Sequence, residues 1–225
     1  MLIYAHRGSS GTEPENTIRA FRQAIADGAG GVELDVHLSS DGVPVVIHDR
    51  DVSRTTNGQG NIDELNLGTI KGLDAGNGER VPTLTEVLHL VAGKLKLYVE
   101  VKQAGIAQTV IDVLEGYPHA EWLIASFDLD TLRQARSISA TAELWPISVM
   151  LTDEVLACAT EVRATAVSLH SIGATADVAE QLSAAGLGMA VWTVNDVAEA
   201  NRVRQLGAVG LCTDVPATIV PALSL

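Results

Sequence analysis

Short runs rich in β-branched residues alternate with alanine-rich helical patterns along all 225 residues of the sequence. This alternation is typical of repeated strand and helix units whose strands pair in parallel. Eight strands each followed by a helix predict an α/β protein, specifically a (β/α)8 TIM barrel. Strands are expected near 2–5, 31–36, 96–101, 121–125, 142–148, 165–169, 188–193 and 208–212. Helices are expected near 15–28, 84–93, 105–116, 129–138, 152–161, 174–186, 195–206 and 215–222.

An open, doubly wound sheet is the alternative arrangement of such units. It usually has fewer strands, and the sequence carries no Gly-x-Gly-x-x-Gly after a strand to support a dinucleotide site. Hydrophobic residues make up 47% of the chain but aromatic residues only 4%. The core must therefore consist mainly of Ala, Val, Leu and Ile, as in parallel sheets whose two faces are both covered.

A long polar segment, residues 48–83, separates the second expected strand from its helix. Segments of this length are usually functional or contain small elements of their own. The apolar run at 42–47 in front of it is expected to form a short extra strand near the barrel mouth. The sequence shows no repeat, low-complexity tract or linker. We therefore expect one domain over 1–225, with 48–83 as a small insert or cap.

The chain is acidic, with a formal net charge of -13 at pH 7. Such a charge repels nucleic acids and anionic membranes, so neither is expected as a partner. No stretch approaches the roughly 20 apolar residues of a membrane span, and no basic region precedes an apolar one at the N-terminus. These features favour a cytoplasmic protein. Cys158 and Cys212 lie in apolar or alanine-rich settings, and we expect them to be reduced core residues.

Polar side chains repeatedly follow the expected strands. In a (β/α)8 barrel the active site lies at the carboxyl ends of the strands, so these positions are the strongest functional candidates. They are His6 and Arg7 after the first strand, Glu33 and Asp35 on the second, His48 and Asp49 after the extra strand, and Glu100 and Lys102 on the third.

The acidic candidates favour a metal site. Glu33 and Asp35 are two residues apart on a strand, so their side chains point to the same face, toward the barrel axis. The same alternation directs Glu100 and Lys102 inward. Three carboxylates provide an all-oxygen ligand set for Mg²⁺ or Ca²⁺. Each acid taken alone could instead form a structural ion pair.

The basic candidates suggest a substrate. Arg7 can hold two phosphate oxygens and Lys102 adds a compact positive charge. Gly8 is expected to let the chain turn sharply after the first strand. Among the other histidines, His37 and His170 could reach the mouth. His89 and His119 lie in a helical pattern and a turn, where a structural role is expected.

Several longer motifs now become recognisable, and the chain resembles the glycerophosphodiester phosphodiesterase family over essentially its whole length. The motifs are HRG…PENT (6–8, 14–17), VELDVHLSSDGVPVVIHD (32–49), RTTNG (54–58), LDAG…VPTLTEVL (73–88), VEVK (99–102), ASFD (125–128), VWTVN (191–195) and TD (213–214).

The resemblance implies metal-dependent hydrolysis of glycerophosphodiesters to sn-glycerol 3-phosphate and an alcohol such as choline or ethanolamine. By resemblance, His6 and His48 are the general acid and base, and Glu33, Asp35 and Glu100 hold Mg²⁺, Ca²⁺ or Mn²⁺. By the same resemblance, Arg7 and Lys102 bind the phosphate, Asn16 lies in the first βα loop of the substrate site, and Trp192 lines the alcohol side.

One segment departs from the family pattern. Only residues 77–81 separate Leu73-Asp74-Ala75-Gly76 from the following Pro-Thr-Leu, where the family usually has a longer, aromatic-containing stretch. We expect a small, open cap, which leaves the leaving alcohol undefined. The oligomeric state and the attacking oxygen, either metal-bound water or the neighbouring glycerol hydroxyl, also stay open.

Three other functions are alternatives. A lysophospholipid or sphingolipid phosphodiesterase would need an apolar surface for acyl chains, and the polar insert disfavours it. A non-catalytic phosphodiester-binding barrel would not need both histidines and all three acids. An aldolase or sugar-phosphate isomerase commonly binds phosphate beyond strands seven and eight, but residues 188–214 contain no glycine-rich phosphate loop.

Overall fold

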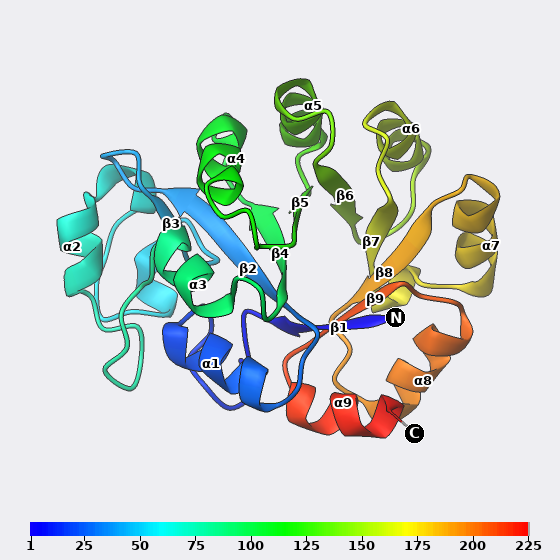
Figure 1. Cartoon of the computed structure of the whole chain (residues 1–225), viewed down its shortest axis with the longest axis horizontal. Helices are drawn as coiled ribbons and strands as arrows, with labels where there is room; N and C mark the ends of the chain where they lie inside the picture. The colour runs from blue at the N-terminus through cyan, green and yellow to red at the C-terminus, as the bar shows by residue number, and fades with distance from the viewer. Residues whose placement is uncertain (225) are drawn as a thin grey trace.

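The computed structural model describes residues 1–224 and is a closed barrel of eight parallel strands surrounded by helices (Figure 1). A ninth strand, β3, is antiparallel and lies outside the barrel wall. Around the sheet the order is β1-β9-β8-β7-β6-β5-β4-β2, and pairing of β1 with β2 closes the ring. The strands are β1 Leu2–His6, β2 Gly31–Leu38, β3 Pro44–Val46, β4 Lys96–Val101, β5 Trp122–Ser126, β6 Glu143–Ser148, β7 Ala166–His170, β8 Gly188–Trp192 and β9 Gly210–Thr213. The TIM-barrel prediction is confirmed.

Helices follow the barrel strands and cover their outer face (Figure 1). Several begin at a Thr, Asp or Asn whose side chain accepts a backbone N–H of the first turn, as Thr17 and Asp196 do. Such caps typically contribute about 1 kcal/mol each. The helices are α1 Ile18–Ala26, α2 Leu67–Gly72, α3 Leu84–Val91, α4 Ala107–Glu115, α5 Leu129–Ile138, α6 Asp153–Glu161, α7 Ala176–Ala184, α8 Val197–Gln205 and α9 Pro216–Leu223.

The first helix begins later than the expected start at residue 15. Thr17 has an extended backbone and accepts a hydrogen bond from the amide of Ala20, so it terminates the loop and caps α1. The preceding residue, Asn16, has a φ of 56°. Residues 14–17 are therefore a turn at the barrel mouth and not the first turn of the helix.

The barrel interior is filled by large aromatic side chains. The rings of Tyr4, Tyr98 and Trp145 meet edge to face, with centroid distances of 5.4–6.0 Å. Inward and outward side chains alternate along each strand, and the outward-facing aliphatic residues pack against the helices. Cys158 and Cys212 are both free and buried, which confirms the prediction of unpaired core thiols.

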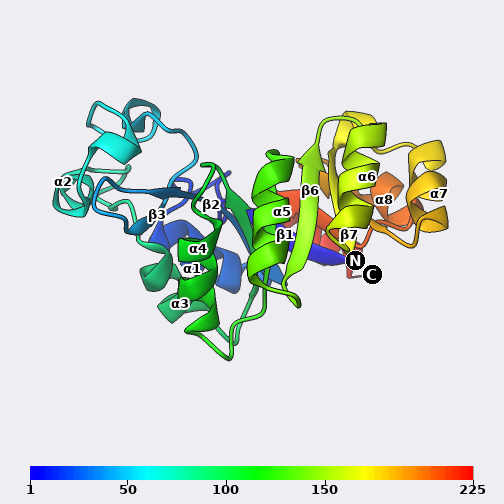
Figure 2. The same cartoon turned by 90° about the horizontal axis from the view of Figure 1, so that it is seen from above.

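The insertion stands to one side of the barrel wall (Figure 2). It contains α2 and two 3-10 helices, η1 Val52–Arg54 and η2 Ile62–Glu64. The extra strand β3 pairs with the end of β2, with Val46 opposite Val36 and Pro44 opposite Leu38. Apolar residues of the insertion form a separate cluster with Val45 of β3 and with Ile47; those of the insertion are Val52, Ile62, Ile70, Ala75 and Val81. The expected extra strand and small elements are therefore present.

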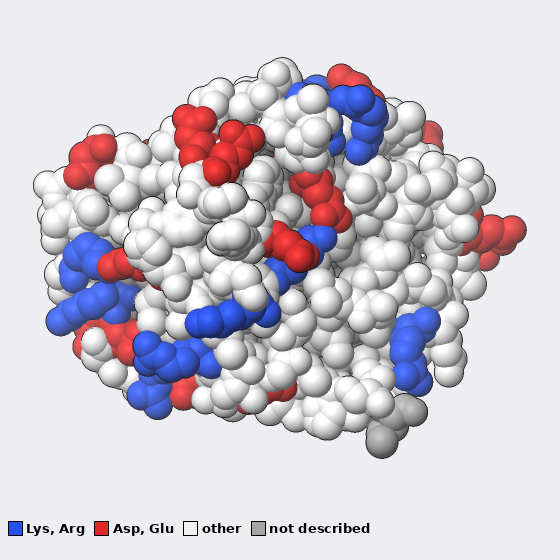
Figure 3. All heavy atoms as spheres, viewed as in Figure 1, with Lys and Arg blue, Asp and Glu red and all other residues white. Residues whose placement is uncertain are grey.

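Charges of both signs are interspersed over the face drawn in Figure 3. The acidic groups do not gather there into one broad patch, and uncharged surface lies between them. Among residues 1–224, no helix combines the length and apolar character needed to cross a bilayer.

Candidate active site

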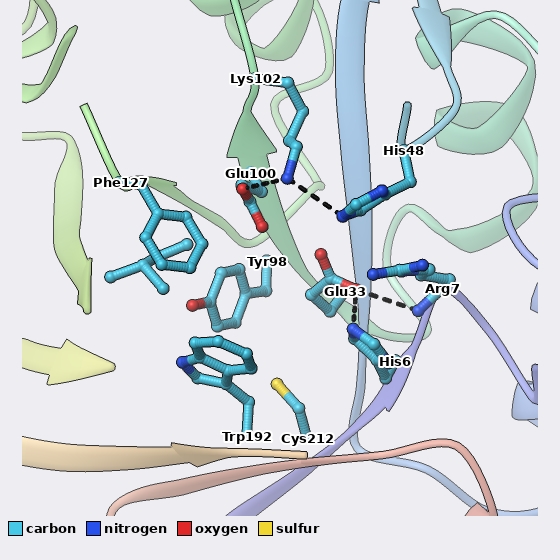
Figure 4. A pocket seen from close by; sticks show the side chains of 11 residues that line it. His6, Arg7, Glu33, His48, Tyr98, Glu100, Lys102, Phe127, Trp192 and Cys212 are labelled. Atoms are coloured by element: carbon cyan, nitrogen blue, oxygen red, sulfur yellow. Dashed lines mark hydrogen bonds and ion pairs between the residues drawn. The ribbon is translucent and has the colours of Figure 1, made fainter. Parts of the chain in front are cut away.

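A pocket opens at the carboxyl ends of the barrel strands and has two unlike sides (Figure 4). Charged side chains from β1, β2, β4 and the start of the insertion form one side. Aromatic and apolar side chains that lie on or directly after β4, β5, β6, β8 and β9 form the other. The lining residues are His6, Arg7, Glu33, His48, Tyr98, Glu100, Lys102, Phe127, Ile147, Trp192 and Cys212.

The three predicted metal ligands lie together. Glu33, Asp35 and Glu100 are buried, and each offers a carboxylate oxygen within 4.8 Å of the others. Register explains this, because Asp35 on β2 lies directly opposite Glu100 on β4. Burial and then the charge of Asp35 raise the pKa of Glu33 to about 8. The cluster holds more negative charge than its immediate surroundings neutralise.

Two cations contact this cluster. Lys102 Nζ lies 2.6 Å from Glu100 Oε1 and 3.7 Å from Asp35 Oδ1. Arg7 Nε lies 3.4 Å from Asp35 Oδ2, and its Nη1 donates to Glu15 Oε1 at 3.0 Å. The two cations offset only part of the negative charge of the three carboxylates, because Arg7 also pairs with Glu15, and a divalent cation would offset the rest.

His6 is held by residues from the far end of the chain. Its Nδ1 lies 2.6 Å from Asp214 Oδ1, and its Nε2 faces Glu33 Oε2 at 3.9 Å. Asp214 also accepts hydrogen bonds from Ser10 Oγ at 3.0 Å and Asn195 Nδ2 at 2.6 Å. Burial alone lowers the pKa of His6, but the Asp214 hydrogen bond and the charge of Glu33 outweigh it and raise the pKa above its ordinary value.

His48 is held by residues of the insertion. Its Nδ1 lies 2.5 Å from Asp49 Oδ1 and its Nε2 lies 3.2 Å from Lys102 Nζ. Arg54 binds Asp49 and also donates to both carboxylate oxygens of Glu15. Burial lowers the pKa of His48, and the charges of Arg7 and Lys102 add to this effect. The hydrogen bond from Arg54 is the main cause that lowers the pKa of Asp49 to about 2.

Asn16 and Gly8 shape the first βα loop. Asn16 Nδ2 donates to Asp35 Oδ2 at 2.8 Å, so its amide supports a carboxylate of the cluster. Substrate contact by Asn16 stays a prediction. Gly8 has a φ of 81°, and a Cβ atom there would come within 2.6 Å of the Ala20 backbone. The sharp turn expected at Gly8 is present, and the close approach of α1 is a second reason for glycine.

Aromatic rings build the opposite side of the pocket. The Trp192 ring meets Phe127 with a centroid distance of 5.6 Å and His170 at 4.9 Å, both edge to face. Trp192 Nε1 is buried. Substrate contact by Trp192 stays a prediction, and its indole N–H has no acceptor among the described residues.

The remaining histidines take supporting positions. His37 is buried and its Nε2 contacts the carbonyl oxygen of His48 at 3.0 Å, so it lies behind the site. His170 Nδ1 accepts from the amide of Ile172 at 3.2 Å. His89 pairs with the hydroxyl of Tyr117 at 2.8 Å, away from the pocket. His119 lies in the turn between α4 and β5.

The residues that complete the two histidine networks lie in motifs quoted above, but the sequence assigned them no role. Asp214 directly follows a strand, so the rule that selected the other candidates would also have selected it. Asn195 follows β8 by three residues and carries a weaker signal of the same kind. Glu15 and Arg54 lie in loops, and no local pattern indicates that they meet.

Comparisons with known proteins identify the family of the chain. The model of the glycerophosphoryl diester phosphodiesterase family matches residues 6–218. A glycerophosphodiester phosphodiesterase from Caldanaerobacter subterraneus subsp. tengcongensis is 36% identical, with 97% of this chain and 96% of the relative covered.

Solved structures of phosphodiesterases have the same fold as this chain. A phosphodiesterase from Oleispira antarctica, in complex with the product sn-glycerol-3-phosphate, has a TM-score of 0.95 and 28% identity over 100% of this chain and 97% of its own. A glycerophosphodiester phosphodiesterase from Thermotoga maritima has a TM-score of 0.80 and 26% identity over 98% and 97%. Given a family match across nearly the whole barrel, the chain belongs to the glycerophosphoryl diester phosphodiesterase family and is a phosphoric diester hydrolase.

Proposed function

We propose that this enzyme hydrolyses glycerophosphodiesters such as glycerophosphocholine or glycerophosphoethanolamine to sn-glycerol 3-phosphate and an alcohol. We further propose that it requires a divalent cation and uses His6 and His48 for proton transfer. The observation that carries the proposal is the arrangement of Figure 4, where two imidazoles and two cations surround one buried carboxylate cluster.

The donor set fits a divalent cation. Glu33, Asp35 and Glu100 would hold Mg²⁺, Ca²⁺ or Mn²⁺, because hard cations prefer carboxylate oxygens. Asp35 Oδ1 and Asn16 Oδ1 are buried without a hydrogen-bond partner among the described residues, so they are free to act as ligands. When bound, such a cation withdraws negative charge from the phosphoryl oxygens.

Arg7 and Lys102 bind the phosphate in this proposal. Both are anchored by carboxylates, Arg7 by Glu15 and Lys102 by Glu100, so each is oriented before substrate arrives. Preorganised charges stabilise a developing negative charge without reorganising during the reaction. The surrounding protein also excludes water from the buried carboxylates.

Hydrogen-bond geometry distinguishes the two histidines. Lys102 Nζ can only donate a hydrogen bond, so His48 Nε2 is the acceptor. The proton of His48 therefore lies on Nδ1, which donates a hydrogen bond to Asp49. We assign His48 Nε2 as the atom that accepts a proton from the attacking oxygen. His6 Nδ1 donates to Asp214 and its Nε2 faces the carboxylate of Glu33. We assign His6 Nε2 as the proton donor to the departing alkoxide.

Release of sn-glycerol 3-phosphate is the direct test of this function. The purified enzyme is treated with a chelator, and then Mg²⁺, Ca²⁺ or Mn²⁺ is restored separately with glycerophosphocholine or glycerophosphoethanolamine as substrate. We expect no product with the chelator and recovery with at least one cation. Full activity in the chelator would contradict the metal requirement, while absence of product in every condition would contradict the substrate assignment.

A further inference from the structure

The main chain at His48 is tied to strand β2 by a buried side chain. His37 of β2 is 6% exposed, and its Nε2 lies 3.0 Å from the carbonyl oxygen of His48. A carbonyl oxygen can only accept a hydrogen bond, so the donor is an N–H at His37 Nε2. The bond forms just after β3 has ended, where the chain enters the insertion. It therefore holds the residue from which one of the two site imidazoles projects.

His37 lies on the strand that also carries two acids of the carboxylate cluster. Glu33, Asp35 and His37 are each two residues apart on β2, so their side chains point to the same face. Strand β3 pairs antiparallel with the end of β2, and beyond it the amide of Ile47 donates to the carbonyl of Asp35 at 3.0 Å. The chain that leads to His48 is thus held twice against the strand of the cluster.

The partners of the His48 ring hold it less firmly than its main chain is held. Figure 4 shows Nε2 directed toward Lys102, and the two nitrogens are 3.2 Å apart. In the proposed function Lys102 binds the phosphate, so it does not serve His48 alone. The other ring nitrogen pairs with Asp49, whose partner Arg54 has an exposed side chain. The position of the imidazole therefore depends on where the main chain of His48 is fixed.

His37 itself is set back from the reacting groups. Of the described residues, those that line the pocket do not include His37. The cluster of candidate metal ligands within the same part of the chain consists of Glu33, Asp35 and Glu100. An effect of His37 on turnover is therefore expected to pass through His48.

We propose that His37 is a positioning residue for His48. Its hydrogen bond to the main chain of His48 fixes the distance between the imidazole and the carboxylate cluster on β2. The inference rests on the proposed function, in which His48 Nε2 accepts a proton from the attacking oxygen. Proton transfer requires hydrogen-bond distance, and a displacement of about 1 Å can cost about 10²-fold in rate.

The test compares His37→Leu with His37→Gln in the release of sn-glycerol 3-phosphate from glycerophosphocholine. His37→Leu removes the donor, and kcat should fall about tenfold, since the ring is displaced but not lost. KM and the cation concentration that gives half-maximal activity should not change. His37→Gln should restore most of kcat, because its amide nitrogen reaches about as far as Nε2 and also donates.

Ser39→Ala is the matched control. Ser39 is buried in the turn between β2 and β3, where its hydroxyl accepts from the amide of Val43 at 3.0 Å and donates to Asp41 at 2.7 Å. The variant weakens the same hairpin without removing the hydrogen bond to His48. It should lower the thermal midpoint and retain kcat. An equal loss of kcat in Ser39→Ala and His37→Leu would overturn the inference, because hairpin stability would then explain both.

A double variant shows whether His37 acts through His48. In the His48→Ala background, added His37→Leu should cause no further loss of kcat, because the ring that it positions is already gone. Product is accumulated over hours to measure the low turnover of this background. A further loss as large as that caused by His37→Leu in the wild type would overturn the inference.

The remaining outcomes separate this inference from the proposed function. Wild-type kcat in His37→Leu, or a rise in KM or in the cation requirement alone, overturns the inference and leaves the proposed function standing. Equal losses in His37→Leu and His37→Gln also overturn it, because the hydrogen bond is then not the cause. Wild-type turnover in His48→Ala, or no product from the wild type, refutes both. If His37→Leu does not fold, His37→Asn replaces it, because its shorter amide cannot reach the carbonyl.

Discussion

The two proposed catalytic histidines are supported by different parts of the molecule. His6 lies at the end of β1, and its partner Asp214 follows β9, the neighbouring strand in the closed barrel. His48 lies at the start of the insertion, and its partner Asp49 is held by Arg54, also of the insertion. Asp214 accepts hydrogen bonds from Ser10 and Asn195. Asp49 is held instead by the guanidinium of Arg54, whose side chain is 46% exposed.

This difference has an energetic consequence. The side chain of His6 is 18% exposed and that of His48 28%, whereas Asp214 and Asp49 are similarly exposed, at 30% and 32%. The Arg54 pair that holds Asp49 is exposed, and exposed ion pairs contribute about 0–1 kcal/mol. We therefore infer that the His6 side of the site depends on closure of the barrel and the His48 side on the conformation of the insertion. The following variants test that difference.

The largest effect should come from the histidines themselves. His6→Ala and His48→Ala should each reduce kcat by about 10²–10⁴-fold, because each removes a proton-transfer group. The matched control is His89→Ala, because His89 lies on α3, away from the pocket, and its ring contacts Tyr117. Turnover of glycerophosphocholine and the thermal midpoint are measured for all three. Wild-type turnover in either site variant would refute the role of that histidine.

A smaller loss is expected from Asp214→Asn, which keeps the shape of the side chain but removes its charge. A hydrogen bond to a charged group contributes about 1.5–3 kcal/mol, so kcat should fall about tenfold to a hundredfold. KM should change little, because Asp214 contacts neither Arg7 nor Lys102 directly. If KM rises while kcat is retained, Asp214 does not position His6 for proton transfer.

The smallest effect should follow Arg54→Met, which removes the exposed link between Asp49 and Glu15. We expect kcat to fall by no more than about fivefold, as is typical of exposed ion pairs. KM should also rise, since Glu15 orients Arg7. Steady-state kinetics check both values, with Arg50→Met as the control because Arg50, in the described part of the chain, pairs with Asp63 alone. A loss as large as that of Asp214→Asn would remove the distinction between the two sides.

Much of the site could be predicted from strand positions. The alternation of inward and outward side chains along the strands predicts that Glu33, Asp35, Glu100 and Lys102 share one face, and the folded chain brings them together. Placement of His6 and His48 at the mouth followed from the position of each after a strand. The helix boundaries were less accurate, because side-chain caps such as Thr17 decide where α1 begins.

Contacts between loops could not be predicted. Glu15 and Arg54 meet because the insertion folds around its own apolar cluster, which brings η1 against the first βα loop. The exposed apolar side chains at the barrel mouth were missed for a similar reason. Phe127, Val149 and Ile172 are far apart in the sequence, and their common exposure depends on how three loops pack.

By itself the sequence determined the barrel, because side-chain alternation and the spacing of strands and helices are local properties. It also determined which residue types stand at the strand ends. Only the tertiary structure decided which of these side chains touch. Asp214 reaches His6 across 208 positions because β1 and β9 pair in one register when the barrel closes, and such long-range closure is a property of the whole fold.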